Sequence, residues 1–260
     1  PFIGQGLVAG LRDAANLAWK LAWVVRGMAG ERILDSYDTE RRPHAKAMID
    51  LARFMGHLIM PRSRLKAVVV HGTVRTLRLL PACRRWFDDL RIKPKNEFRT
   101  GLFVTSAPFT RPLAGKWLPQ GLVRRPDGSV AMSDDVLGDR LTLIGCGADA
   151  EAFLDDATRR AWQAAGGSIA RIEPRGGALH DATTCEDMSD ALVPGTAPVG
   201  WAVIARPDRT IMHDGPVGDS ARLVREVLAT MDASRVARTA AHSLADSLTL
   251  NPESRDPCCN

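Results

Sequence analysis

The chain has 260 residues, 45% of them hydrophobic, and a formal net charge of +5, which is typical of a globular protein that buries a sizeable core. No stretch approaches the roughly 20 apolar residues that a membrane-spanning helix needs, so we expect no membrane partner. The charge is uneven, because residues 1–100 carry 19 Lys/Arg against 9 Asp/Glu and the other 160 carry 16 against 21. This asymmetry favours two domains of different character.

The first third of the chain has helical patterns throughout. After Gly4-Gln5-Gly6, apolar residues recur at helical spacing up to Val25, and Gly27 and Gly30 are expected to end this first helix. A second helix is predicted from Asp35-Ser36, with Pro43 as a kink or a restart. This second helix is predicted to end at residue 61. Two further helices are predicted at residues 65–80 and 83–90.

The pattern changes near residues 93–95, and prolines mark a connection up to residue 118. A turn is predicted at residues 125–128. Strands and helices then alternate, with strands at 141–144, 168–172, 201–205 and 210–212 and helices at 150–165 and 220–231. A βαβ unit followed by a β-hairpin and a helix predicts a small α/β domain. The expected organisation is a first domain at 1–95, a linker at 96–118, a second domain at 119–235 and a disordered tail at 236–260.

Gly4-Gln5-Gly6 leads directly into a helix, which is a suitable arrangement for binding an anion. Glycines let the backbone approach a ligand closely, and the first N–H groups of a helix have no intrahelical partner. The helix dipole adds roughly half a positive charge at this end. Two glycines before a helix also form plain tight turns, so the turn alone leaves both interpretations open.

Four strings in this region resemble class A flavoprotein monooxygenases. PFIGQGL at residues 1–7 and GLRDAANLAWKL at residues 10–21 resemble the third FAD-binding motif of that family, and LDSY at 34–37 and ERRPHA at 40–45 resemble the segment after it. The members that it resembles include the 3-(3-hydroxyphenyl)propionate hydroxylases and the phenol and polyketide hydroxylases. The resemblance implies an α/β protein: the helical C-terminal end of a Rossmann-like, glutathione-reductase-type FAD-binding domain, followed by a thioredoxin-like domain.

The resemblance also implies where the flavin binds. Pro1 and Phe2 would line it, Gly4 and Gln5 would form the turn, and the backbone N–H groups around Gly6, Leu7 and Val8 would face its pyrimidine carbonyl. Many members have Asn in place of Val8, so a side-chain contact there is in doubt. This places a fixed positive dipole against the ring that gains negative charge on reduction.

The activity implied is FAD-dependent hydroxylation of a phenolic substrate with NADH or NADPH and O₂, through a flavin C4a-hydroperoxide. The fingerprint GxGxxG and the family's Gly-Asp motif are absent from these residues, and no catalytic residue is predicted. We therefore expect this chain alone neither to hold FAD tightly nor to turn over. The alternative is a non-catalytic interaction module, and a homodimer is possible in either case.

A group of polar residues on the two first helices has two interpretations. They either approach the cofactor or join the helices through ion pairs and caps, and the second interpretation is favoured. These residues are Arg12, Asp13, Asn16, Glu40 and Arg41. Trp19 and Trp23 are expected in a core or an interface.

The second domain resembles the thioredoxin-like domain of the same hydroxylases at Pro119-Gln120, residues 134–138 and residues 206–208. Cys146 stands alone without a CxxC partner, so we expect a structural rather than a disulfide-exchange role. The cysteines and histidines show no metal-ligand spacing, and the free thiols favour a cytoplasmic setting. The basic run at 62–99 lacks a nucleic-acid recognition motif, so no nucleic-acid partner is expected.

Overall fold

The computed structural model describes residues 5–60, 63–77, 79, 97–104 and 113–232. The described residues divide into two compact units. One contains the residues up to Leu17 and those from Tyr37 to Gly101, and the other contains residues 18–36 and those from Leu102 onward. The first long helix therefore contributes residues to both units.

The predicted helices of the first third are confirmed where they can be compared. They are α1 (Gln5–Val25), α2 (Asp35–Ile59) and α3 (Arg64–Leu77), with a short 3-10 helix, η2 (Glu31–Leu34), before α2. Helix α2 runs through Pro43 without a break. The predicted helix at residues 83–90 lies outside the described residues, as does the predicted tail at 236–260.

Gly27 ends α1 in the way that its position predicts. Its φ of 69° lies in the left-handed region that favours glycine. The N–H of Gly27 bonds to the carbonyl of Val24, and that of Met28 bonds to the carbonyl of Trp23, at 3.0 and 2.8 Å. This is a Schellman motif, which satisfies two of the carbonyls left open at the helix end.

The second unit is built on a seven-stranded mixed sheet in the described part of the chain. Its order is β2-β1-β5-β4-β3-β6-β7. Strands β3, β4 and β5 are parallel, and the other pairs are antiparallel. The bounds are β1 (Leu122–Arg124), β2 (Val130–Met132), β3 (Thr142–Cys146), β4 (Ser168–Glu173), β5 (Thr184–Asp187), β6 (Trp201–Ala205) and β7 (Ile211–Pro216).

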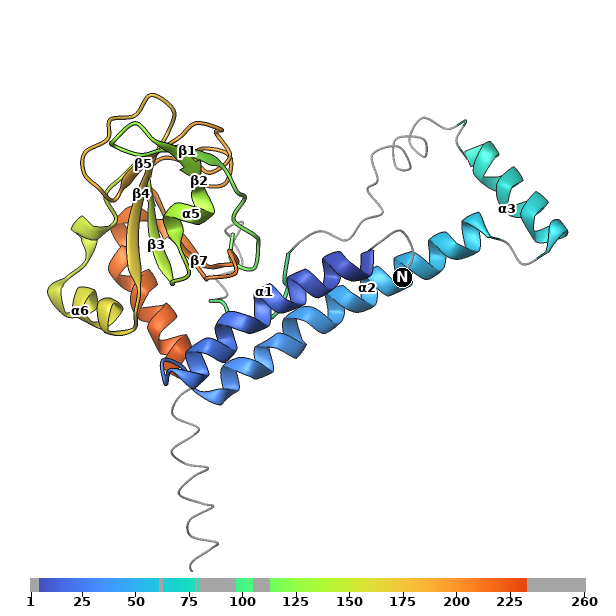
Figure 1. The fold of residues 1–260 in the computed structure, drawn as a ribbon, viewed down its shortest axis with the longest axis horizontal. Coiled ribbons are helices and arrows are strands. Elements are labelled where there is room, and N and C mark those ends of the chain that lie inside the picture. The colour runs from blue at the N-terminus through green and yellow to red at the C-terminus, as the bar shows by residue number, and fades with distance from the viewer. Residues whose placement is uncertain (1–4, 61–62, 78, 80–96, 105–112, 233–260) are drawn as a thin grey trace, which may run out of the picture. The chain divides into compact units, whose positions relative to one another are not determined.

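The centre of this sheet has the predicted thioredoxin-like order. Strand β3, helix α6 (Asp156–Ala164) and β4 form the parallel βαβ unit, and the β6–β7 hairpin leads into the helix of residues 220–232 (Figure 1). A short helix, α5 (Ser133–Leu137), follows β2. The α/β fold class is confirmed.

Alternation along the central strands sends apolar side chains to both faces of the sheet. On one face, Leu143 and Ile204 pack with Trp162 of α6 and with Leu223 of the helix at 220–232. On the other face, the cluster includes Ile144, Val203 and Ile211, together with Leu137 of α5 and Leu192. Both faces of the sheet are therefore covered, which explains why β3 and β6 are almost continuously apolar.

The end of α1 is part of the first of these two clusters. Trp19 and Trp23 are 8% and 4% exposed, and Ala29 and Ile33 are buried with them. The two indoles meet edge to face at a centroid distance of 5.5 Å. The expectation that these tryptophans belong to a core is confirmed, and the core is that of the α/β unit.

The predicted helix at 150–165 is wrong in its first third. Residues 151–153 form a 3-10 turn, Leu154 is extended, and α6 begins only at Asp156. The reason is Asp155, whose carboxylate accepts the Thr158 N–H at 2.8 Å and thereby caps the helix at this point.

Part of the predicted linker packs on the α/β unit. The Val104 N–H bonds to the Met212 carbonyl at 2.8 Å, and the Asp214 carboxylate accepts the N–H groups of Leu113 and Ala114. The domain boundaries at residues 95 and 118 stay predictions. Among the described helices, none is both long and apolar enough to cross a membrane.

Candidate functional site

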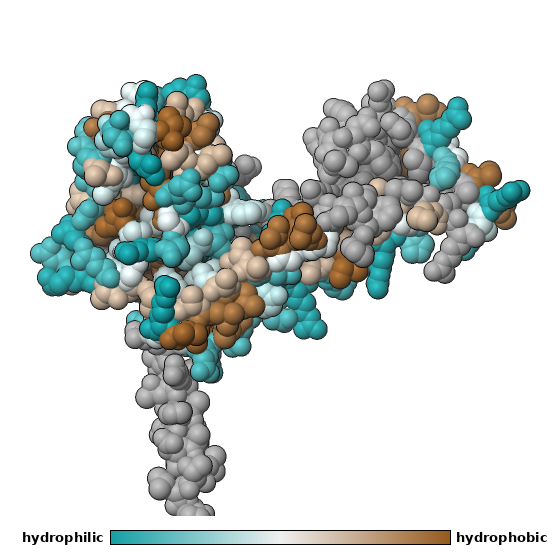
Figure 2. Space-filling view, viewed as in Figure 1, coloured by the Kyte–Doolittle hydropathy of each residue, from teal (hydrophilic) through white to brown (hydrophobic). Residues whose placement is uncertain are grey.

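The predicted flavin-facing segment is the first turn of α1. Pro1, Phe2 and Gly4 lie outside the described residues. The turn contains Gln5, Gly6, Leu7 and Val8, of which Leu7 is 74% and Val8 43% exposed. Exposed apolar side chains continue along the helix, and Figure 2 shows hydrophobic surface over α1. The first turn of this helix is therefore open on its outer side.

The chemistry of this turn fits an electron-rich group. The first four N–H groups of an α-helix have no intrahelical acceptor, and the 21-residue α1 has no acidic side chain in its first turn that would compensate them. A flavin carbonyl that gains negative charge would find donors and a positive dipole here. The cofactor contacts of residues 1–8 stay a prediction.

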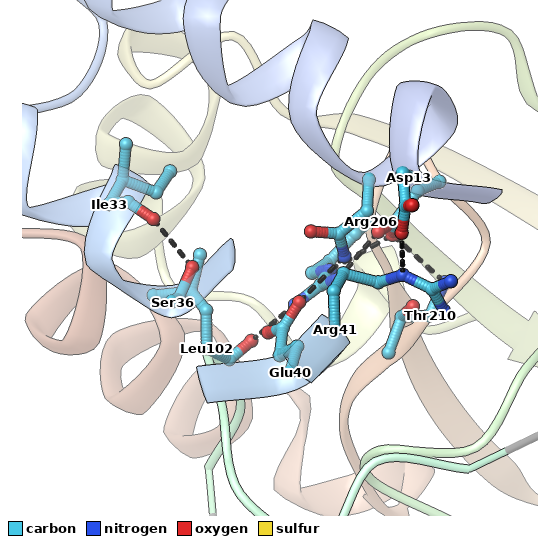
Figure 3. A network of polar contacts seen from close by, with 10 residues as sticks. Asp13, Ile33, Ser36, Glu40, Arg41, Leu102, Arg206 and Thr210 are labelled. Atoms are coloured by element: carbon cyan, nitrogen blue, oxygen red, sulfur yellow. Dashed lines mark hydrogen bonds and ion pairs between the residues drawn. The ribbon is translucent and has the colours of Figure 1, made fainter. Parts of the chain in front are cut away.

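The polar residues of the two first helices join the helices to each other. The Asn16 amide donates to a Glu40 carboxylate oxygen at 2.7 Å, and Arg41 Nε donates to Asp13 Oδ1 at 2.6 Å. Figure 3 shows Asp13 and Arg41 pointing toward each other from the two helices. The favoured interpretation as helix-joining pairs is confirmed for Asp13, Asn16, Glu40 and Arg41 and stays a prediction for Arg12.

Gly101 lies against this network, and its substitution is a direct test of how tightly the network is packed. A Cβ at Gly101 would lie 2.3 Å from Glu40 Cγ, and Glu40 is 2% exposed and held by Asn16. Because moving the glutamate aside would break its bond with Asn16, and because Gly101 has a φ of 156°, we expect Gly101→Ala to destabilise this unit by about 1–3 kcal/mol. Amide hydrogen exchange of α2, compared between the unchanged protein and the variant, measures this difference in the unit concerned.

A matched substitution in the same unit should be harmless. A Cβ at Gly56, inside α2, meets nothing within 4 Å. Gly56→Ala should therefore leave stability unchanged or raise it by up to about 1 kcal/mol, because alanine is the better helix former. Equal destabilisation by both variants would show that Gly101 is not in a tight contact.

The thiols of the α/β unit are unsuited to redox chemistry. Cys146 and Cys185 are both buried and free. Burial raises the pKa of the Cys146 thiol to about 12, and burial likewise raises the pKa of Cys185. A reactive cysteine needs a lowered pKa, so disulfide exchange is not supported. In the described part of the chain, no group of His, Cys, Asp or Glu side chains is arranged to hold a metal ion.

The sequence did not indicate that Arg206 is a buried cation of the α/β unit. Arg206 is 0% exposed and pairs with Asp208 through two bonds, at 3.0 and 2.6 Å. It also donates to the Leu102 carbonyl at 3.1 Å and lies 5.4 Å from the centroid of the Trp19 ring. Arg206 thus joins the β6–β7 turn to residue 102 of the predicted linker (Figure 3). It also lies against Trp19 near the end of α1, in the same unit.

Two family models match the chain. Residues 1–52 match the FAD binding domain, and residues 115–230 match the HcaD C-terminal domain. The chain is 38% identical over 224 residues to 3-(3-hydroxy-phenyl)propionate/3-hydroxycinnamic acid hydroxylase of Burkholderia cenocepacia (strain HI2424), covering 81% of the chain and 40% of that protein. The protein of the same name from Klebsiella pneumoniae (strain 342) is 42% identical over 172 residues, or 66% of the chain and 31% of that protein.

Solved structures show the same fold. The flavin-dependent monooxygenase PieE, in complex with FAD and substrate, has a TM-score of 0.59 at 22% identity, over 88% of this chain and 45% of that one. Aklavinone-11 hydroxylase, in a ternary complex with FAD and aklavinone, has a TM-score of 0.58 at 21% identity, over 89% and 41%. The resemblance to class A FAD-dependent aromatic-ring hydroxylases is confirmed, and the chain spans about 40% of the length of the first curated relative.

Proposed function

We propose, from this relationship to the FAD-dependent aromatic-ring hydroxylases, that the chain is the C-terminal part of an enzyme that hydroxylates a phenolic substrate with NADH or NADPH and O₂. FAD would supply the redox chemistry and the activation of oxygen. The part played by this chain is to hold the flavin ring at the start of α1. On its own, the 260-residue chain neither retains FAD nor turns over.

One observation carries the proposal: residues 1–7, which resemble the family's third FAD-binding motif, run into the first turn of α1, and that turn is exposed. Gly6, Leu7 and Val8 are exposed in the first turn, so a flavin ring can approach the open N–H groups. Asp13 and Arg41, whose charged side chains could have contacted the cofactor, are paired with each other instead. The contribution of the chain is therefore a backbone dipole rather than a titrating side chain.

The first test is to read about 300 codons upstream of this sequence in its source DNA, since the 224 aligned residues are only 40% of the first curated relative. An in-frame GxGxxG and a Gly-Asp motif support the proposal, and the encoded enzyme should then oxidise NADH or NADPH when a phenolic substrate is added. A stop codon or unrelated sequence upstream contradicts it and favours the interaction module. Stoichiometric FAD in the purified 260-residue chain would contradict the expected inactivity of this part alone.

A charge at the helix start tests the flavin contact in the encoded enzyme. Gly6→Glu places a carboxylate beside the open N–H groups, where it competes with the flavin carbonyl. We expect the FAD content of the purified enzyme to fall on the order of tenfold. Val25→Glu is the control, because Val25 is 86% exposed at the other end of the same helix. Equal loss of FAD in both variants would show that the effect is not a local contact.

The proposal also places the enzyme in the cytoplasm, where reduced nicotinamides are supplied, and includes a homodimer. Sedimentation of the encoded enzyme tests whether it is a homodimer.

A further inference from the structure

The buried face of α2 consists mostly of ionisable residues. From Tyr37 on, this helix belongs to the first compact unit, the helical unit. Among the described residues of α2, four are buried, and helical spacing places them on one side. They are Glu40, Arg41, His44 and Met48, and only Met48 is apolar. The packing of α2 in the helical unit therefore depends on how these charged and polar groups are paired.

Two of the three ionisable side chains are paired with α1, and His44 is not. Glu40 accepts from Asn16, and Arg41 donates to Asp13, at 2.7 and 2.6 Å. His44 is 8% exposed, both of its ring nitrogens are closed to solvent, and neither has a hydrogen-bond partner. A neutral imidazole can be held in this way at a modest cost, but a charged one needs acceptors for two N–H groups.

The charges around His44 oppose a further positive charge. Burial lowers the pKa of His44, Arg41 of the same helix and Arg12 of α1 lower it further, and Asp13 acts in the opposite direction. Asp13 already accepts from Arg41, and Glu40, one turn before His44, is already held by an amide of α1. An imidazolium at this position would therefore face two guanidiniums, and the carboxylates of α1 and α2 beside it are bonded elsewhere.

The nearest space for a charged imidazole is a pocket beside α2. The pocket has a volume of about 720 Å³, and His44 lines it together with Phe98 and with one charge of each sign, Glu97 and Arg99. The ring nitrogens do not open into this pocket, because they are closed to solvent. A charged ring would have to leave its buried position to reach Glu97 or water, and this movement breaks the packing of α2.

We propose that His44 makes the packing of the helical unit sensitive to acid. When the imidazole takes up a proton, the charge finds no acceptor in the buried position, the ring leaves that position, and α2 loosens from the part of α1 that belongs to the same unit. All residues involved belong to one unit of this chain, so the inference goes beyond the proposed function and does not depend on flavin binding.

Acid should weaken the helical unit because folded His44 binds its proton less readily than a free histidine does. The pKa of a free histidine is about 6.5, and that of His44 in the folded unit is lower. Above about pH 6.5 the ring is neutral in both states. As the pH falls below that value, the opened unit binds one more proton than the folded unit, so stability is lost until the pH reaches the folded pKa. Unperturbed carboxylates titrate at lower pH.

The experiment measures amide hydrogen exchange of residues 37–57 in the full 260-residue chain, as protection relative to an unstructured peptide at the same pH. Between about pH 7.5 and about pH 5.5, we expect this protection to fall by up to about tenfold, the effect of one proton taken up on opening. His44→Leu, which fills a similar space and cannot be protonated, should remove most of the fall. His57→Gln is the matched control, because His57 is exposed on the same helix and its loss should leave the fall unchanged.

Two further measurements decide the matter even where His44→Leu fails to fold. His44→Gln removes the same titration but keeps a polar side chain, so it should also remove most of the fall. In the unchanged chain carrying ¹³C-labelled histidine, the assigned ring signal of His44 should be mostly that of neutral imidazole at about pH 5.5, where a solvated histidine is charged. An undiminished fall in His44→Leu or His44→Gln, its loss in His57→Gln, or a charged His44 ring in an α2 that keeps its protection would each overturn the proposal.

Discussion

Replacing Trp23 with alanine should destabilise the α/β unit by about 3–5 kcal/mol, the usual cost of removing a large aromatic side chain from a core. Trp23 is 4% exposed and packs with Trp19, Ile33 and the apolar face of the sheet. Trp162 and Leu223 belong to the same buried cluster and are already packed, so they can fill the cavity only by leaving other contacts. The loss of stability should therefore appear in the strands of the sheet, which are distant in the sequence from residue 23.

Amide hydrogen exchange of β3 and β6 measures this loss in the unit concerned, which avoids assigning one free energy of unfolding to a protein with two units. Leu21→Ala is the control: it shortens an apolar side chain on the same helix, but Leu21 is 43% exposed, so the change should stay within about 1 kcal/mol. If both variants speed exchange equally, then Trp23 does not belong to the core of the sheet.

The position of Trp23 also bears on how this chain can be divided. A fragment that starts at Leu102 would lose Trp19, Trp23, Ala29 and Ile33 from one face of its sheet. The helix that begins with the flavin motif thus ends inside the α/β core. Periodicity along α1 predicted a single buried face but could not show that its two halves pack in different units.

The parts of the fold that could be predicted have strong local signals. Helix α1 has a regular apolar spacing and a glycine at its end, and β6 is an uninterrupted apolar run. Strands β1, β2 and β5 were missed because they have three or four residues each. Strand β5 even contains two carboxylates, those of Glu186 and Asp187, and the sequence does not show that Arg124 and the loop N–H groups will bond to them.

The same limit applies to the sites. The flavin motif could be recognised because its residues are contiguous. His44 stood in a recognised string, yet the pocket that it lines is shared with Phe98, which is distant in the sequence. The environment of Arg206 likewise comes from Leu102 and Trp19, which only the fold brings together.

Replacing Arg206 with methionine should cost about 3–5 kcal/mol, although the new side chain has a similar length and is apolar. The Asp208 side chain is 4% exposed, so the variant leaves a buried carboxylate without its guanidinium. The Leu102 carbonyl loses a donor, and the Trp19 ring loses one of the two cations that lie near it, the other being Lys20. Urea unfolding followed by hydrogen exchange of β6 and β7 measures the change.

Two further variants separate the ion pair from the volume of the side chain. Arg222→Met removes an arginine that is 48% exposed and pairs with Asp219 and Glu226, so its cost should stay within about 1 kcal/mol. Asp208→Asn in the Arg206→Met background removes the unpaired charge and should recover part of the lost stability. If the double variant is no more stable than Arg206→Met, the loss comes from packing against Trp19, and the buried charge is not its cause.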